Sequence, residues 1–134
     1  MVQSIQQLIA PAGIRFTYSV YPTQLILNAD KEMMEQLLIN LLKNAHEACE
    51  GLLDKNIKLK AEMLGNTVQL TIADNGQGIS AEALDKIFIP FYSTKAGGSG
   101  IGLSLCRQIV SRHKGKISVR SDKQGTRFKI ELPN

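Results

Sequence analysis

Residues 56–74, NIKLKAEMLGNTVQLTIAD, hold two apolar runs of strand period joined by a turn. Apolar and polar residues alternate over 57–63 and again over 68–72, as in strands that bury one face. Gly65 and Asn66 stand between the two runs, and both residue types favour a tight turn. The stretch therefore predicts an antiparallel hairpin whose second strand ends in an aspartate.

Further strands are predicted on both sides of this hairpin. Upstream, the alternating pattern of 14–22 (IRFTYSVYP) predicts a strand with one buried face. Downstream, 116–121 (KISVRS) and 126–133 (TRFKIELP) flank the turn residues DKQG and predict a closing hairpin. The side chains expected on the buried face of the upstream strand are Ile14, Phe16, Tyr18 and Val20.

The longest helix is predicted directly after Asp30. An aspartate suits the N-cap position, and Glu32 in the first turn suits the helix dipole. Gly51 is a suitable stop. The apolar positions recur at helical spacing and form a wide stripe. They are Met33, Met34, Leu37, Leu38, Leu41, Leu42, Ala45 and Ala48.

Two shorter helices are expected in the second half of the chain. Residues 80–88 (SAEALDKIF) predict a brief helix with Ser80 as its cap. Residues 101–115 predict an amphipathic helix that Gly115 closes. Residues 89–100 lie between them, contain a proline and three glycines, and predict a loop.

The order of elements is strand, helix, hairpin, short helix, loop, helix, hairpin. Strands grouped in hairpins favour the α+β class, with a mixed, mostly antiparallel sheet and helices on one face. A doubly wound parallel sheet would require strict alternation of strand and helix, which this order lacks. The length of 134 residues predicts one domain.

Composition and charge exclude several classes of function. The net charge of +4 suits an anionic ligand, an acidic partner or a solvated lysine-rich surface. No run of like charges predicts a nucleic-acid partner. No apolar run reaches membrane-spanning length, and no signal-peptide pattern precedes the first strand. Cys49 and Cys106 fall in helical patterns and are expected to be buried free thiols. The two cysteines and two histidines do not form a zinc motif, and a cytoplasmic setting is expected.

Polar residues interrupt the long helix on one strip of its surface. Asn40, Asn44 and Glu47 are spaced by four and three residues and therefore share a face. One interpretation is a polar face turned to water. The other is a row of oxygen ligands turned to a bound ligand, of the kind that suits Mg²⁺ shared with phosphate.

The residues DNGQGIS, 74–80, follow the central hairpin. Asp74 could accept a hydrogen bond from an amino group, including that of a purine, while Gly76 and Gly78 would let a flat ring approach the main chain. The alternative is an ordinary turn. Thr126 could reach a ligand near Asp74 if their strands are neighbours, or it could simply be a good strand residue.

The residues GGSGIGLSL, 97–105, place four glycines at the entrance to a helix. Free N–H groups and the positive end of the helix dipole make such a loop a phosphate cradle. The motif is neither a Walker A loop nor a dinucleotide fingerprint. Lys95 could add a charge for a terminal phosphate; the alternative is a flexible surface loop. Phe88 and Phe91, just upstream, are expected to be core residues at the base of this loop.

These elements together resemble the ATP-binding catalytic domain of bacterial sensor histidine kinases, within the superfamily of gyrase, Hsp90 and MutL (the Bergerat fold). QLLINLLKNAHEA (36–48) is similar to the family's N box and DNGQGI (74–79) to its G1 box. IFIPFYSTK (87–95) is similar to the F box and GGSGIGLSL (97–105) to the G2 box. The likeness covers nearly all of the chain from about Leu25 onward.

The resemblance implies a two-layer α/β sandwich of about five strands and three helices that binds Mg-ATP. It implies that Asp74 binds the adenine amino group, with Thr126 close by through water. It also implies that Gly76 and Gly78 shape the adenine pocket and that Ile79 packs on the ring. It further implies that Asn44 coordinates Mg²⁺ and that Asn40 lies near the phosphates. The phosphate chain would be held by Gly98, Ser99, Gly100, Ile101, Gly102 and Leu103, with help from Lys95.

Two positions depart from the family pattern. Many sensor kinases have a basic residue where this chain has Glu47, so this residue is assigned to the site without a defined role. Superfamily ATPases usually carry a glutamate where this chain has Asn40. Because an amide cannot take a proton from water, this departure favours phosphoryl transfer over hydrolysis.

The resemblance also implies partners outside this chain. The family's phosphoacceptor histidine lies on a separate dimerisation domain, and neither His46 nor His113 stands in a matching motif. We therefore expect a monomeric fragment of a longer, homodimeric kinase, which can be membrane-anchored and passes its phosphoryl group to a response regulator. The fragment alone should not phosphorylate itself. The alternatives are a stand-alone ATPase or clamp, an anti-sigma-type serine kinase, and a structural domain without a ligand.

Overall fold

Residues 13–92 and 102–134 are described by the structure, a computed structural model. They contain a five-stranded sheet in the order β1-β2-β3-β5-β4. β1 pairs parallel to β2, and every other pair of neighbours is antiparallel. The strands are β1 (Arg15–Tyr21), β2 (Asn56–Leu64), β3 (Thr67–Asp74), β4 (Lys116–Asp122) and β5 (Gly125–Pro133).

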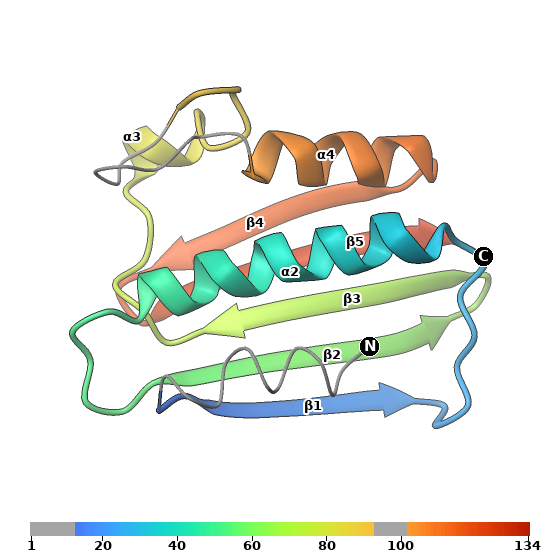
Figure 1. The fold of residues 1–134 in the computed structure, drawn as a ribbon, viewed down its shortest axis with the longest axis horizontal. Helices are drawn as coiled ribbons and strands as arrows, with labels where there is room; N and C mark the ends of the chain where they lie inside the picture. Colours follow the sequence, from blue (N-terminus) through green and yellow to red (C-terminus); the bar gives the residue numbers. More distant parts are fainter. Residues whose placement is uncertain (1–12, 93–101) are drawn as a thin grey trace.

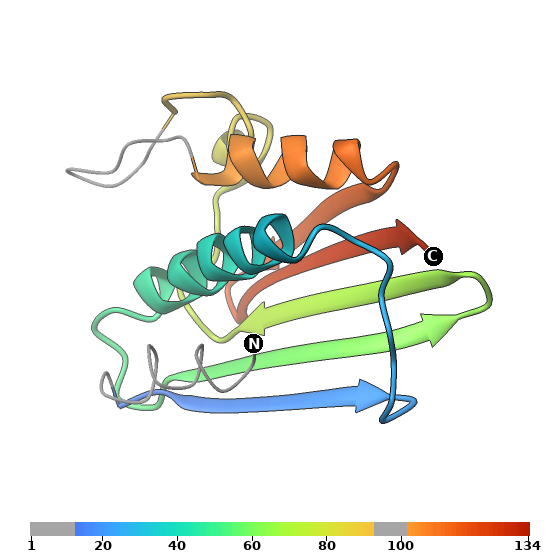
Figure 2. The same cartoon turned by 45° about the vertical axis from the view of Figure 1, so that its right-hand side comes forward.

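Three described helices, α2 (Lys31–Ala48), α3 (Ala81–Leu84) and α4 (Gly102–Arg112), complete the fold. All of them lie on the same side of the sheet, with α2 beside α4 (Figures 1 and 2). The predicted α+β sandwich, with its mixed sheet, two hairpins and single helical layer, is therefore confirmed. None of the helices in this described part is long and apolar enough to span a membrane.

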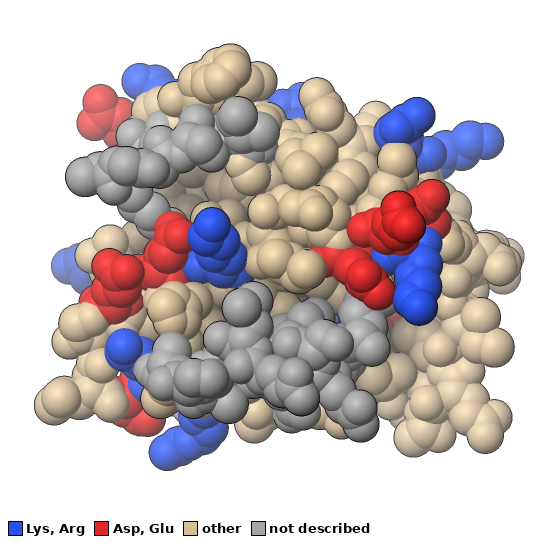
Figure 3. All heavy atoms as spheres, in the orientation of Figure 1, with Lys and Arg blue, Asp and Glu red and all other residues tan. Residues whose placement is uncertain are grey.

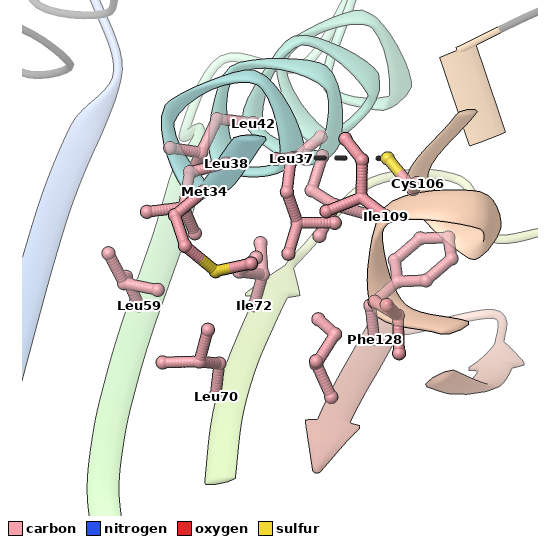
Figure 4. Close-up of a cluster of buried hydrophobic side chains, with 14 of the residues drawn as sticks. Met34, Leu37, Leu38, Leu42, Leu59, Leu70, Ile72, Cys106, Ile109 and Phe128 are labelled. Carbon is pink, nitrogen blue, oxygen red and sulfur yellow. Dashed lines mark hydrogen bonds between the residues drawn. The ribbon is translucent and has the colours of Figure 1, made fainter. Parts of the chain in front are cut away.

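The core lies between α2, α4 and the inner face of the sheet (Figure 4). Leu37 and Leu41 of α2 are fully buried, and the alternating residues of β3 and β5 face them. Each such side chain contributes roughly 1.5–3 kcal/mol on burial, so this interface accounts for most of what holds the two layers together. The strand residues involved are Val68, Leu70, Ile72, Phe128, Ile130 and Leu132.

The ends of the helices follow the predicted caps in part. Asp30 accepts a hydrogen bond from the Met33 N–H at 2.9 Å, as expected for an N-cap. Ser80 likewise caps α3, but this helix ends at Leu84, which is earlier than predicted. The chain then runs through turns and a bend to Pro90, which cannot extend a helix.

The end of α4 differs from the sequence-based expectation. The residue with positive φ is Lys114 (φ 58°), not Gly115. Gly115 is needed for a different reason, since a Cβ atom there would lie 2.4 Å from the carbonyl oxygen of Glu131 in β5. The glycine therefore permits close packing against the sheet.

His113 joins the end of α4 to the start of α2. Its Nε2 accepts from the Asp30 N–H at 3.1 Å, and its Nδ1 lies 2.8 Å from the Ile109 carbonyl oxygen. Because Nε2 accepts, Nδ1 carries the proton and donates. The neutral ring thus has both nitrogens satisfied in a structural role.

β1 only partly fulfils its prediction. Ile14, just before it, is buried, and Phe16 and Val20 are half-buried, but Tyr18 is 49% exposed. The expectation of a buried face is wrong at Tyr18, because β1 is an edge strand and lies farther from α2 and α4 than the other strands in Figure 1.

Both cysteines are buried free thiols, as predicted. Burial raises the pKa of Cys106 to about 12. The pKa of Cys49 is also raised, first by burial and then by the Asp74 carboxylate nearby. Both thiols therefore stay protonated in the folded chain at neutral pH.

Cys106 should make the folded state lose stability at alkaline pH. Above about pH 9 the unfolded chain releases the thiol proton, while the folded chain keeps it until about pH 12. The free energy of unfolding should therefore fall by on the order of 1 kcal/mol per pH unit from this group alone. Urea unfolding at several pH values between these limits should show a shallower decline for Cys106→Ala. Parallel declines would contradict the assignment.

Candidate functional site

The polar residues singled out in the sequence gather at one end of the sheet. β3 ends there, β4 ends there and β5 begins there, and the C-terminal end of α2 lies over them, at the left in Figure 1. Antiparallel pairing of β3 with β5 brings Asp74 beside Thr126, which are far apart in sequence. The site is thus a product of the sheet topology.

Asp74 is tied to the surrounding main chain. One carboxylate oxygen, Oδ1, accepts from the Gly76 N–H at 2.8 Å and from the Thr126 N–H at 3.3 Å. Thr126 is only 4% exposed. These contacts fix the direction of the carboxylate, and an orientated acid beside a hydroxyl can recognise a group that presents both a donor and an acceptor.

Ser121 of β4 belongs to the same cluster, although sequence reasoning missed it. Its Oγ accepts from the Ile79 N–H at 2.6 Å, lies 2.9 Å from Thr126 Oγ1, and lies 3.3 Å from the Gly125 carbonyl oxygen. The available signal was its place in β4, on the face that Ile117 and Val119 also share. A polar residue at an inward strand position is a candidate for function.

Asn75 was also missed, and it locks the turn that carries Asp74. Its Oδ1 accepts from the Asn56 N–H at 2.8 Å, and its Nδ2 donates to the Asp54 carbonyl oxygen at 2.7 Å. The Cys49 thiol approaches the same Oδ1 at 3.5 Å. The turn is therefore held to β2 and to the end of α2.

The glycines at this end accommodate the protein's own main chain. A Cβ atom on Gly76 would lie 2.4 Å from the Ala48 carbonyl oxygen at the end of α2. One on Gly78 (φ +82°) would lie 2.1 Å from the Asp122 carbonyl oxygen. The sequence suggested room for a flat ring; the structure shows that close approach between loop, helix and hairpin already requires both glycines.

A cavity of about 710 Å³ opens beside this cluster. That volume is typical of a small-molecule site. Leu84 and Val119 provide apolar lining, while polar side chains provide the rest. The polar and charged lining residues are Asp74, Arg120, Ser121, Asp122, Gln124, Thr126 and Arg127.

The polar strip on α2 lies beside the start of α4 at Asn40. Asn40, Asn44 and Glu47 are each half-buried. The Asn40 Nδ2 atom is buried without a hydrogen-bond partner among the described residues. Its Oδ1 would lie 3.7 Å from a Cβ atom on Gly102, the first residue of α4. A buried amide without an acceptor costs about 1–3 kcal/mol, which makes this atom a candidate donor to a ligand oxygen.

Of the remaining residues predicted to bind phosphate, only those at the start of α4 are described by the structure. Gly102 and Leu103 form its first turn. Lys95, Gly98, Ser99, Gly100 and Ile101 lie outside the described residues. Within 13–92 and 102–134, no group of three His, Cys, Asp or Glu side chains could hold a metal ion.

The two phenylalanines before α4 have different environments. Phe88 packs edge-on against Phe128, with ring centroids 6.5 Å apart, and is a core residue as predicted. Phe91 is 77% exposed and has positive φ (69°). The prediction of two core phenylalanines is therefore wrong for Phe91, because the turn at Pro90 directs the chain away from the core.

The surface over the helices carries charges of both signs. Among the described residues visible in Figure 3, basic and acidic side chains are interspersed.

Comparison with protein families gives one model that spans most of the chain. The model for histidine kinase-, DNA gyrase B- and HSP90-like ATPases matches residues 29–134. The C4-dicarboxylate transport sensor protein DctB of Rhizobium meliloti is 42% identical over 99 residues, which are 74% of this chain and 16% of that protein. The sensor histidine kinase ZraS of Klebsiella oxytoca is 35% identical over an alignment of 135 residues, which covers 98% of this chain and 29% of that protein. The chain thus spans less than a third of either relative.

Solved structures agree with the sequence comparison. The catalytic domain of histidine kinase ThkA, in a nucleotide-free form, superposes with a TM-score of 0.86 and 34% identity, covering 97% of this chain and 86% of that one. ThkA in complex with the response regulator TrrA gives a TM-score of 0.82 and 31% identity, over 98% and 39% of the two chains. Full-length ShkA in complex with AMPPNP gives a TM-score of 0.85 and 26% identity, and the match covers 98% of this chain and 28% of that one.

Proposed function

The chain belongs to the family of histidine kinase-, DNA gyrase B- and HSP90-like ATPases, and we propose that it is the Mg-ATP-binding catalytic domain of a two-component sensor histidine kinase. It donates the γ-phosphoryl group of ATP to a histidine on a dimerisation domain outside this chain. A response regulator then receives the group, as the complex of ThkA with TrrA suggests by analogy.

The observation that carries this proposal is the fixed pair of Asp74 and Thr126 beside the cavity. The carboxylate is an acceptor and the hydroxyl can donate, so the pair suits the amino group and N1 of adenine. Leu84 and Val119 in the lining suit the faces of a flat base. Ile79, held through its N–H to Ser121, is proposed to pack on the ring from the loop side.

The phosphates are proposed to lie between Asn40 and the start of α4. The Nδ2 of Asn40, which has no partner among residues 13–92 and 102–134, could donate to a phosphate oxygen. The first-turn N–H groups at Gly102 and Leu103 offer further donors. Mg²⁺ would be held through Asn44 and shared with the phosphates, since the described residues provide no protein-only metal cage. When bound, the ion supplies neutralisation of phosphate charge.

Asn40 also favours transfer over hydrolysis. Its amide can orient a phosphate but cannot remove a proton from water. Phosphoryl transfer needs positioning and charge stabilisation more than a covalent role for the protein. The chain therefore supplies the donor side of the reaction, and the acceptor histidine enters from a dimerisation domain outside this chain.

Labelling with radioactive ATP tests the function. The chain alone should bind Mg-ATP without becoming labelled, whereas the full-length protein should acquire an acid-labile, alkali-stable phosphohistidine. Steady ATP hydrolysis by the chain alone, or label on a serine of a partner protein, would contradict the proposal.

Asn44→Ala should remove the effect of Mg²⁺ on ATP affinity. Loss of a metal-site residue typically weakens metal binding by roughly tenfold or more. Calorimetric titration with ATP, in the presence of Mg²⁺ and of EDTA, should show a Mg²⁺-dependent gain for wild type and none for the variant. Gln36→Ala, on the exposed face of α2, is the matched control and should behave like wild type. An unchanged Mg²⁺ effect in Asn44→Ala would contradict the assignment.

A further inference from the structure

The hydrogen bonds around Ser121 limit where its hydroxyl proton can point. A serine hydroxyl has a single proton to donate. Its oxygen already accepts the Ile79 N–H at 2.6 Å. The proton can therefore go to Thr126 Oγ1 at 2.9 Å or to the Gly125 carbonyl oxygen at 3.3 Å. The shorter contact lies close to the normal O–H···O distance, whereas the longer one exceeds it.

Donation from Ser121 to Thr126 determines what Thr126 offers to a ligand. Once Thr126 Oγ1 accepts that proton, its own proton is directed elsewhere, and the threonine acts as a donor. The Thr126 N–H already holds Asp74 Oδ1 at 3.3 Å. The pocket then presents an acid acceptor and a hydroxyl donor side by side.

We propose that Ser121 is a specificity-determining residue, which sets the Thr126 hydroxyl as a donor and so selects 6-aminopurine nucleotides over 6-oxopurine nucleotides. This inference rests on the proposed function. Adenine presents an amino donor and the N1 acceptor at that edge, which complement the pair. Guanine presents an oxygen acceptor and an N1–H donor, which oppose it.

A merely structural role predicts a different outcome. Ser121 also holds the Ile79 N–H, so its loss could loosen the loop that follows Gly78. A loosened loop would weaken ATP and GTP binding together. If Ser121 instead orients the Thr126 hydroxyl, its loss would lower the preference for ATP over GTP. The Thr126 hydroxyl could then rotate and accept a hydrogen bond from guanine.

The test is titration of the chain with Mg-ATP and Mg-GTP. Ser121→Ala should reduce the ratio of the two affinities by roughly tenfold, the effect of one hydrogen bond. Ser121→Thr keeps the hydroxyl on a residue that suits a strand and should restore the ratio. Ser118→Ala, on the exposed face of the same strand, is the control and should match wild type.

A second variant keeps the proposal falsifiable if Ser121→Ala folds poorly. Thr126→Val removes the hydroxyl with little change in shape and should give the same loss of preference. Adding Ser121→Ala to it should lower the ratio no further, because both changes act through one hydroxyl. Thermal unfolding of each variant reports its folding.

Three results would overturn the proposal. If Ser121→Ala reduces both affinities and leaves their ratio unchanged, Ser121 has only a structural role, and the proposed function still holds. An additive effect in the double variant would show that the two hydroxyls act separately. Failure of the wild-type chain to bind either nucleotide would overturn the proposed function and this inference together.

Discussion

Asp74→Asn is expected to weaken ATP binding by roughly 10- to 100-fold, the range for losing a hydrogen bond to a charged group. An asparagine can keep one oxygen for the Gly76 and Thr126 N–H groups, so the loop should keep its shape. The substitution replaces the other carboxylate oxygen with an NH₂ group, which repels the adenine amino group. Binding should fall while folding is retained.

Calorimetry with ATP and GTP, together with thermal unfolding, measures both effects. The preference for ATP over GTP should be lost along with affinity. Asp85→Asn, at the exposed end of α3, changes the charge equally without touching the cavity and should bind like wild type. If Asp74→Asn binds ATP as tightly and as selectively as wild type, Asp74 does not contact adenine and its assignment to the site is wrong.

Gly125→Ala should lower the free energy of unfolding by roughly 3 kcal/mol or more. Gly125 has φ +142°, and a Cβ atom there would lie 1.9 Å from the Asp74 carbonyl oxygen. That oxygen belongs to the main chain and cannot rotate away, so β3 and β5 would have to separate at the site. ATP binding should fall with stability, because Asp74 and Thr126 depend on this approach.

Gly65→Ala is the matched control for this substitution. Gly65 also has positive φ (+64°), but a Cβ atom there meets nothing within 4 Å. It should cost only about 1–2 kcal/mol, the penalty for a left-handed backbone. Urea unfolding of the two variants separates conformational strain from steric overlap, and equal losses would contradict the overlap seen at Gly125.

The architecture was predictable because its signals are local. The hairpin of β2 and β3 follows from alternation around Gly65 and Asn66, and α2 follows from its stripe and its Asp30 cap. Errors arose where tertiary position overrides pattern. Tyr18 lies on an edge strand, and Phe91 lies on a turn that points away from the core.

The sequence indicates single residues of the candidate site but not the contacts between them. Asp74 and Thr126 stand out in the sequence, whereas Ser121 reaches Ile79 across 42 residues and becomes visible only when β4 lies beside β5. The bonds of Asn75 to Asp54 and to Asn56, the first residue of β2, are likewise long-range. Close approaches of backbone, such as that at Gly125, leave no local signal beyond the glycine itself.

The most direct test of an ATP site at Asp74 is a crystal structure of the chain with Mg²⁺ and a non-hydrolysable ATP analogue. The adenine amino group should lie within hydrogen-bond distance of the Asp74 carboxylate, with the phosphates between Asn40 and the start of α4. An adenine bound away from Asp74, with Asn40 Nδ2 still lacking an acceptor, would contradict the account.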